Sequence, residues 1–173
     1  LLETVLQTRE RSLGSDDVLL AETLTSLGEL ARDRGELDAA DAYLSRARAI
    51  REAKLSPVSA ELGTTLSMLA TLRYRQERLA EADTLYQRVL AIDAVARDPL
   101  DPRTLRDLRG LAAVYGRQKR LKDADSLWRL VLERQRRALG PQHPDVGRTL
   151  SNLGANAYMD NRFDDAARYY GEA

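Results

Sequence analysis

Apolar residues recur along the chain with the spacing of amphipathic helices, and the pattern repeats every 42 residues. The first landmark is a pair of leucines three residues apart: Leu24 and Leu27, Leu66 and Leu69, Leu108 and Leu111, Leu150 and Leu153. The second is an apolar residue followed three places later by Ala: Leu37 and Ala40, Leu79 and Ala82, Leu121 and Ala124, Phe163 and Ala166. The third lies four residues further on: Leu44, Tyr86, Trp128 and Tyr170. Three landmarks that keep one period over four copies indicate an internal repeat.

Each copy predicts two helices, called helix A and helix B, joined by a short break. Helix A has apolar residues at i, i+3 and i+7, as in residues 108–115. Helix B presents its Ala on the same face as its large apolar residues, and a small residue allows two helices to cross closely. The breaks lie at Arg34-Gly35, Gln76-Glu77, Gln118-Lys119 and Asp160-Asn161. Gly35 and Asn161 suit the left-handed conformation that ends many helices.

The period and the start signals place the repeats. We expect the end of a preceding repeat at 1–14, repeat one at 15–56, repeat two at 57–98, repeat three at 99–140 and an incomplete repeat four at 141–173. Asp17 and Asp101, with Pro102 behind it, are good N-cap signals, whereas repeat two could begin at Ser56-Pro57 or at Ser59. We expect 1–173 to form a single repeat domain, and to be a segment of a longer protein.

These landmarks resemble the tetratricopeptide repeat (TPR), whose helix A carries a Leu and a small residue and whose helix B carries Ala and an aromatic residue. The usual period of that family is about 34 residues. The period of 42, and the string LGxxHPDVxxTLxNLG between Leu139 and Gly154, resemble the longer kinesin-light-chain type. The resemblance implies an all-α fold, a right-handed superhelix of antiparallel helix pairs, and a role as a protein–protein interaction scaffold. Such repeats are also similar to the sensor arms of bacterial regulators.

By the same resemblance, the peptide-binding groove is lined by helix A. The groove residues are Thr64, Ser67, Thr71, Tyr74, Arg106, Arg109, Arg148, Ser151, Asn152 and Tyr158. The arginines among them could form bidentate hydrogen bonds to carboxylates of an acidic peptide. The alternative is that they pair with Asp107 or Asp145 and do nothing else. Of the paired Asn residues that hold the peptide backbone in kinesin-light-chain-type repeats, only Asn152 is present here.

Charge is balanced over the chain but not between repeats. Lys and Arg number 27, as do Asp and Glu, while repeat three alone has eleven bases and five acids. This basic repeat is either a solvated face with salt bridges between repeats or an anion-binding stripe. The excess of Arg over Lys indicates a bacterial source. The chain has no Cys and no apolar run of membrane-spanning length, and no signal peptide is visible, so we expect a cytoplasmic protein without a membrane segment.

Nothing in the sequence indicates catalysis. It contains no phosphate-binding loop, no nucleophile motif and no set of His and Cys with metal-ligand spacing, so we expect no enzyme, no cofactor and no metal. The single histidine, His143, is expected to cap or pack the start of a helix, and Trp128 to lie in the core. Two other functions remain open: an assembly or self-association module, and a nucleic-acid binder through repeat three, which the acidic neighbouring repeats oppose.

Overall fold

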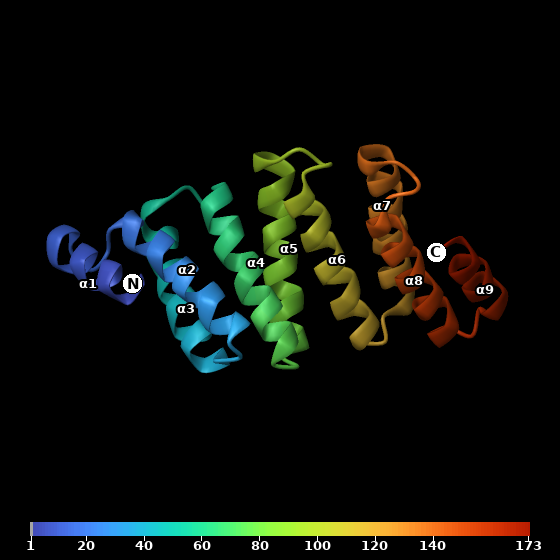
Figure 1. Ribbon diagram of the computed structural model, residues 1–173, viewed down its shortest axis with the longest axis horizontal. Helices are drawn as coiled ribbons and strands as arrows, with labels where there is room; N and C mark the ends of the chain where they lie inside the picture. The colour runs from blue at the N-terminus through green and yellow to red at the C-terminus, as the bar shows by residue number, and fades with distance from the viewer. Residues whose placement is uncertain (1) are drawn as a thin grey trace. The chain divides into compact units, whose positions relative to one another are not determined.

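The computed structural model describes residues 2–173, and over these residues the chain forms helices and no strand (Figure 1). The elements are α1 (Leu2–Leu13), α2 (Val18–Asp33), α3 (Leu37–Lys54), α4 (Ala60–Arg75), α5 (Leu79–Ala96), α6 (Pro102–Arg117), α7 (Leu121–Leu139), α8 (Pro144–Met159) and α9 (Phe163–Glu172). Even-numbered helices are the predicted helices A, and α3, α5, α7 and α9 are the helices B. None of the described helices is both long and apolar enough to cross a membrane.

Every helix A begins at a capping side chain, and these four caps are 42 residues apart. Asp17 accepts a hydrogen bond from the amide of Leu19, and Asp101 accepts one from the amide of Arg103, each at 2.8 Å. Capping side chains satisfy amides at the helix start that no helix carbonyl can reach. The predicted caps are therefore confirmed. Of the two candidate starts for repeat two, the structure selects Ser59, whose hydroxyl accepts from the amide of Leu62 at 3.2 Å.

The turn between helix A and helix B also repeats. Residues 35, 77, 119 and 161 all have φ between 58° and 78°, in the left-handed region. The predictions for Gly35 and Asn161 are confirmed. The same conformation is adopted by Glu77 and Lys119, where the side chain makes it less favourable than it is for glycine.

The chain forms two compact units, one up to Ala96 and the other from Arg97 to Ala173. In the first unit α2 packs on α3, α3 on α4 and α4 on α5, with α1 against α2. In the second unit α6 packs on α7, α7 on α8 and α8 on α9. The division lies within two residues of the predicted end of repeat two.

The core of each unit follows the sequence landmarks. The leucine pairs and the helix B alanines are buried, and so are Leu44, Tyr86 and Trp128. The predicted core position of Trp128 is confirmed. Tyr170 occupies the same register but is half exposed, and it lies in the last turn of α9 with its ring beside Gly154 of α8.

Candidate functional site

The predicted groove residues of the first unit lie on α4, and most of their polar groups are used within the unit. The hydroxyls of Thr64 and Thr71 each donate to the carbonyl four residues earlier, at 3.0 Å. Thr71 also shares a 3.0 Å hydrogen bond with the hydroxyl of Tyr86 on α5. Ser67 is only 2% exposed, so its side chain does not reach the surface. Thr64, Thr71 and Tyr74 are partly exposed.

In the second unit the two arginines at equivalent positions of α6 and α8 are exposed. The side chain of Arg106 is 56% exposed, and its Nε lies 3.4 Å from Oδ1 of the buried Asp107. Arg148 is 62% exposed and donates to Asp145 one turn earlier. These are the ion pairs that the sequence offered as the alternative to ligand binding. An ion pair at the surface, such as Arg148 with Asp145, contributes about 1 kcal/mol or less, so a ligand carboxylate can compete for Arg148. Arg106 is also exposed, and its 3.4 Å contact with Asp107 is long for a hydrogen bond between charged groups.

The other predicted residues of the second unit differ in exposure. Arg109 is partly buried, and its buried Nε has no hydrogen-bond partner among the described residues. Ser151 is exposed, and its hydroxyl donates to the carbonyl four residues earlier at 3.1 Å. Asn152 is half-buried. Tyr158 is exposed, and its ring packs edge-on against the ring of Phe163, with centroids 5.5 Å apart. Tyr158 belongs to α8 and Phe163 to α9, and these two helices lie side by side in Figure 1.

Much of the basic charge of repeat three is engaged inside the second unit. Arg134 donates to the carbonyl of Pro99 at 3.3 Å, and Arg136 forms an ion pair with Glu172 at 3.0 Å. The guanidinium of Arg120 lies 3.8 Å from the centre of the Tyr115 ring. These contacts favour the interpretation in which repeat three is a solvated face with internal salt bridges.

Polar contacts between consecutive repeats recur in register, and none was identified from the sequence. Arg9 donates to the hydroxyl of Thr23 at 2.8 Å, and Arg51, 42 residues later, donates to the hydroxyl of Thr65. In the second unit the same register holds Gln135 and Thr149, which are both buried and joined by a 2.6 Å hydrogen bond. A buried polar group must be paired, so these contacts fix how one repeat seats on the next.

A second set of contacts joins helices B. Glu10 pairs with Arg46 at 2.5 Å, and Glu52 with Arg88 in the same register. In the second unit the polarity is reversed, with Arg136 in the place of Glu10 and Glu172 in the place of Arg46. A 42-residue alignment of the chain on itself contains this signal in three of its four copies, because the remaining copy has Ala94 and Leu130 at the two positions.

His143 caps α8 as expected. Its Nδ1 accepts a hydrogen bond from the amide of Asp145 at 3.2 Å, and Pro144 follows at the first helical position. Among the residues that the structure describes, no three His, Cys, Asp or Glu side chains form a group that could hold a metal ion.

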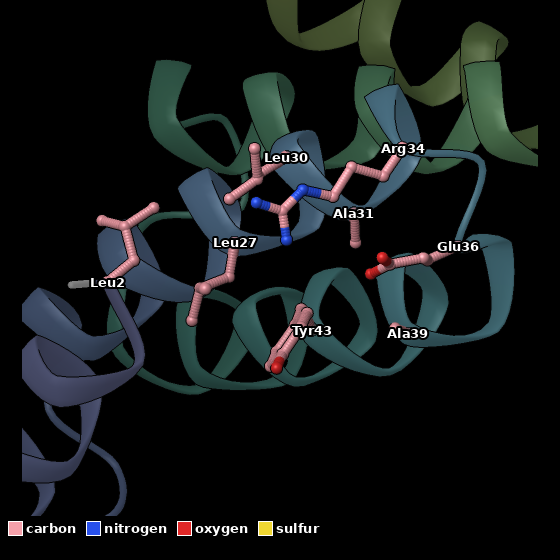
Figure 2. Close-up of a pocket in the computed structure, with 8 residues that line it drawn as sticks. All are labelled: Leu2, Leu27, Leu30, Ala31, Arg34, Glu36, Ala39 and Tyr43. Atoms are coloured by element: carbon pink, nitrogen blue, oxygen red, sulfur yellow. The ribbon is translucent and has the colours of Figure 1, made fainter.

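One cavity marks a surface for repeat stacking (Figure 2). It measures about 360 Å³ and lies between α2 and α3, with Leu2 of α1 also in its lining. Leu27, Leu30, Arg34 and Tyr43 are among the other lining residues. In Figure 2 the Arg34 side chain reaches from α2 across the cavity, above Tyr43 of α3. The residues 42 positions after the two leucines are Leu69 and Leu72, and these are buried against α3. The cavity therefore presents a face that, one repeat later, is covered by a helix B.

Comparison with known families finds one repeat type over nearly the whole chain. Family models described as tetratricopeptide repeat match residues 61–127 and 107–173, and another with the same description matches residues 20–61. No curated protein matches the chain in sequence.

Solved structures show the same fold. A Podosopora anserina protein described as a kinesin light chain, with nearly identical TPR-like repeats, is 20% identical, with a TM-score of 0.86 over 99% of this chain and 81% of that one. BtubC (BKLC) from P. vanneervenii is 23% identical, with a TM-score of 0.76 over 99% and 71%. MamA is 16% identical, with a TM-score of 0.70 over 99% and 81%. These likenesses confirm the predicted fold class, an all-α solenoid of antiparallel helix pairs of the kinesin-light-chain-like type.

Proposed function

The chain belongs to the tetratricopeptide-repeat family, and from this premise we propose that it is an interaction scaffold whose helix A surface binds an extended, acidic segment of a partner protein. Repeats of this kind act as general protein-interaction scaffolds, because stacked helix pairs present a long continuous surface. The partner chemistry is inferred from the side chains that the second unit exposes.

The observation that carries the proposal is the pair Arg106 and Arg148. They occupy the same position in successive helices A, and more than half of each side chain is exposed. Arginine presents parallel N–H donors that fit a carboxylate, and both side chains now donate to aspartates on their own helices. The exchange of Asp145 for a ligand carboxylate would keep the hydrogen bonds of Arg148 satisfied.

Burial limits which of the predicted groove residues a partner can contact directly. Ser67 is buried and Thr71 is bonded to Tyr86, so we assign direct contacts chiefly to the second unit. Tyr158 and Ser151 are exposed on α8 and can contact a peptide side chain and a peptide backbone group. Arg109 and Asn152 would support the neighbouring contacts, and Thr64 and Tyr74 are partly exposed groove positions of the first unit, considered by itself.

The test uses an array of short extended peptides that vary in acid content. Binding of the native chain is compared with Arg106→Glu/Arg148→Glu, which reverses both exposed charges. The control is Lys122→Glu/Arg137→Glu, because both side chains are exposed on α7 and the change in net charge is the same. We expect acidic peptides to bind the native chain and the control, and to bind the helix A variant at least about tenfold more weakly. Equal binding by both variants would refute the helix A assignment.

The setting of the scaffold is also a proposal. We infer that residues 1–173 act as one repeat array in a bacterial regulatory protein of the cytoplasm. The repeat type, which is similar to that of a kinesin light chain, supports the regulatory role, and the dominance of Arg over Lys supports the bacterial source. An interaction role accounts for the exposed side chains of helix A without any catalytic group.

A further inference from the structure

A cavity of about 380 Å³ in the first unit combines an apolar floor with arginines. It lies between α3, α4 and α5. Leu69 and Leu85 contribute the apolar floor, and Arg48, Arg73 and Arg88 line its sides. This volume is in the range of small ligand sites, which bury an apolar group and use a few charged groups for orientation.

The arginines differ in how firmly they are held. Arg73 is 11% exposed and is fixed by Asp41 at 2.7 Å and Glu81 at 3.2 Å. Its hydrogen bond keeps the pKa of Asp41 below its usual value, so this carboxylate stays charged. The side chains of Arg48 and Arg88 are 40% and 39% exposed, and both donate to the single carboxylate of Glu52.

The charges of this cluster do not balance. Four arginines, the three in the cavity wall and Arg78, face three carboxylates, from Asp41, Glu52 and Glu81. The cluster therefore has one excess positive charge. Two half-exposed guanidiniums that share one carboxylate can both donate to a second one without losing the first.

Repeat stacking does not require these arginines. In the second unit, where α8 packs on α7, Leu132 occupies the register of Arg48 and Ala157 that of Arg73. Glu172 occupies the register of Arg88. Arg48 and Arg73 are therefore local to the first unit, whereas Arg88 shares its register with Glu172, which also forms an ion pair between helices B.

We propose that this cavity is a second peptide site, which takes an apolar side chain followed by a carboxylate side chain. The apolar group would contact Leu69 and Leu85, and the carboxylate would accept hydrogen bonds from Arg48 and Arg88. Because these two arginines are half-exposed at the rim, the cavity opens to solvent and a continuous peptide can enter with one pair of side chains.

This site is separate from the helix A surface. With 100° between successive helical residues, Leu69 and Arg73 lie on roughly the opposite side of α4 from Ser67 and Thr71. The remaining wall comes from the helices B, α3 and α5. A peptide bound here would leave Arg106 and Arg148 untouched, so its test does not depend on the proposed function.

The probe is the peptide acetyl-Leu-Glu-amide, and it is compared with one peptide that lacks the charge and one that lacks the large apolar side chain. Acetyl-Leu-Gln-amide removes the charge and keeps the shape, and acetyl-Ala-Glu-amide removes the apolar contact. Each is titrated into the isotopically labelled chain, and amide shifts are followed by NMR. We expect saturable shifts at residues 45–48 and 80–88 with the first probe, and about tenfold weaker binding of each relative.

Two variants localise the binding. Arg48→Gln/Arg88→Gln removes both half-exposed guanidiniums but keeps Arg73 with its carboxylates. Thr84→Trp fills the cavity without a change of charge, because Thr84 is an exposed part of the cavity wall. Arg137→Gln, at an exposed position of α7, is the matched control. Circular dichroism checks that each variant keeps its helicity. The proposal requires both cavity variants to lose at least about fivefold in affinity while the control binds as the native chain does. It fails if the Gln peptide binds as well as the Glu peptide, if either cavity variant binds normally, or if the shifts lie elsewhere.

Discussion

The crossing of α2 and α3 at Gly28 gives a direct test of packing in the first unit, through the substitution Gly28→Ala. Gly28 lies in α2, opposite Leu44 of α3. A Cβ atom added at Gly28 would lie 2.6 Å from Cγ and 2.8 Å from Cδ2 of Leu44. Real Cβ atoms do not approach other carbon atoms this closely, so one helix or the Leu44 side chain must move.

Leu44 has little freedom to move. It is fully buried and packs in one cluster with Ala40, Leu69 and Leu72. Overpacking of this kind costs about 1–3 kcal/mol. The gain in helix propensity on replacing Gly with Ala is about 1 kcal/mol and opposes this cost. We therefore expect a net loss of about 1 kcal/mol in the free energy of unfolding.

Two other glycines separate the cost of overpacking from the gain in helix propensity. An added Cβ at Gly116, near the end of α6, meets no atom within 4 Å, so Gly116→Ala should gain about 0.5–1 kcal/mol. Gly154, in the register of Gly28, would meet the ring of Tyr170 at 2.8 Å, but that ring is half exposed and can turn aside. Gly154→Ala should be nearly neutral. The expected order of stability is the variant at 116, then that at 154, then that at 28.

The measurement is urea unfolding followed by far-ultraviolet circular dichroism and by fluorescence. Trp128 is the only tryptophan, so fluorescence excited selectively at tryptophan reports the second unit alone. The two signals together show whether the units unfold in one transition. A cycle with Leu44→Ala completes the test, because the methyl group at 28 should partly fill the space that Leu44 leaves. The reasoning is refuted if Gly28→Ala stabilises the chain as much as Gly116→Ala does, or if the cycle shows no coupling.

Three further predictions concern the ends of the helices. His143→Ala should cost about 1 kcal/mol by removing the cap of α8, whereas His143→Asn should keep most of it, and thermal unfolding of the two variants checks this. Lys119→Gly should raise stability by about 0.5–1 kcal/mol, since residue 119 has φ of 62° and is exposed, and a matched Lys122→Gly inside α7 should lower it. The hydrogen bond from Arg103 lowers the pKa of Asp101 from 3.8 to about 2. As the pH falls, Asp101 is therefore protonated in the unfolded chain before it is protonated in the folded chain. Its contribution should be complete above about pH 4 and disappear as the pH falls through 2, and Asp101→Asn should remove that part of the acid destabilisation in unfolding measured against pH.

The sequence was sufficient for the parts of the fold that depend on local chemistry. Period, helix order and caps follow from apolar spacing and from side chains next to the amides they bind. Asp101 followed by Pro102 specifies one helix start, and the structure has it there. Ser56 and Ser59 offered two starts with the same local chemistry, and the structure has the one that lies 42 residues from both Asp17 and Asp101, namely Ser59.

The candidate site was less predictable, because exposure depends on neighbouring helices. Helical spacing places Ser67 and Thr71 on one face of α4, but α5 supplies Tyr86 to bond with Thr71, and Ser67 is buried. Arg106 and Arg148, by contrast, were predicted both as groove residues and as members of ion pairs, and they form the ion pairs while staying exposed. Whether they also bind a partner is the proposal that the peptide array tests.

The contacts between repeats show what distinguishes one repeat from another. The apolar landmarks are nearly the same in every copy, so they cannot determine which repeat stacks on which. The polar register positions do differ. Glu10 with Arg46 and Arg136 with Glu172 occupy equivalent positions with opposite polarity, and both pairs form. The geometry therefore accepts either order of two opposite charges. Because like charges at these two positions would repel, the polar pairs favour the native order of repeats that the common apolar stripe allows but does not specify.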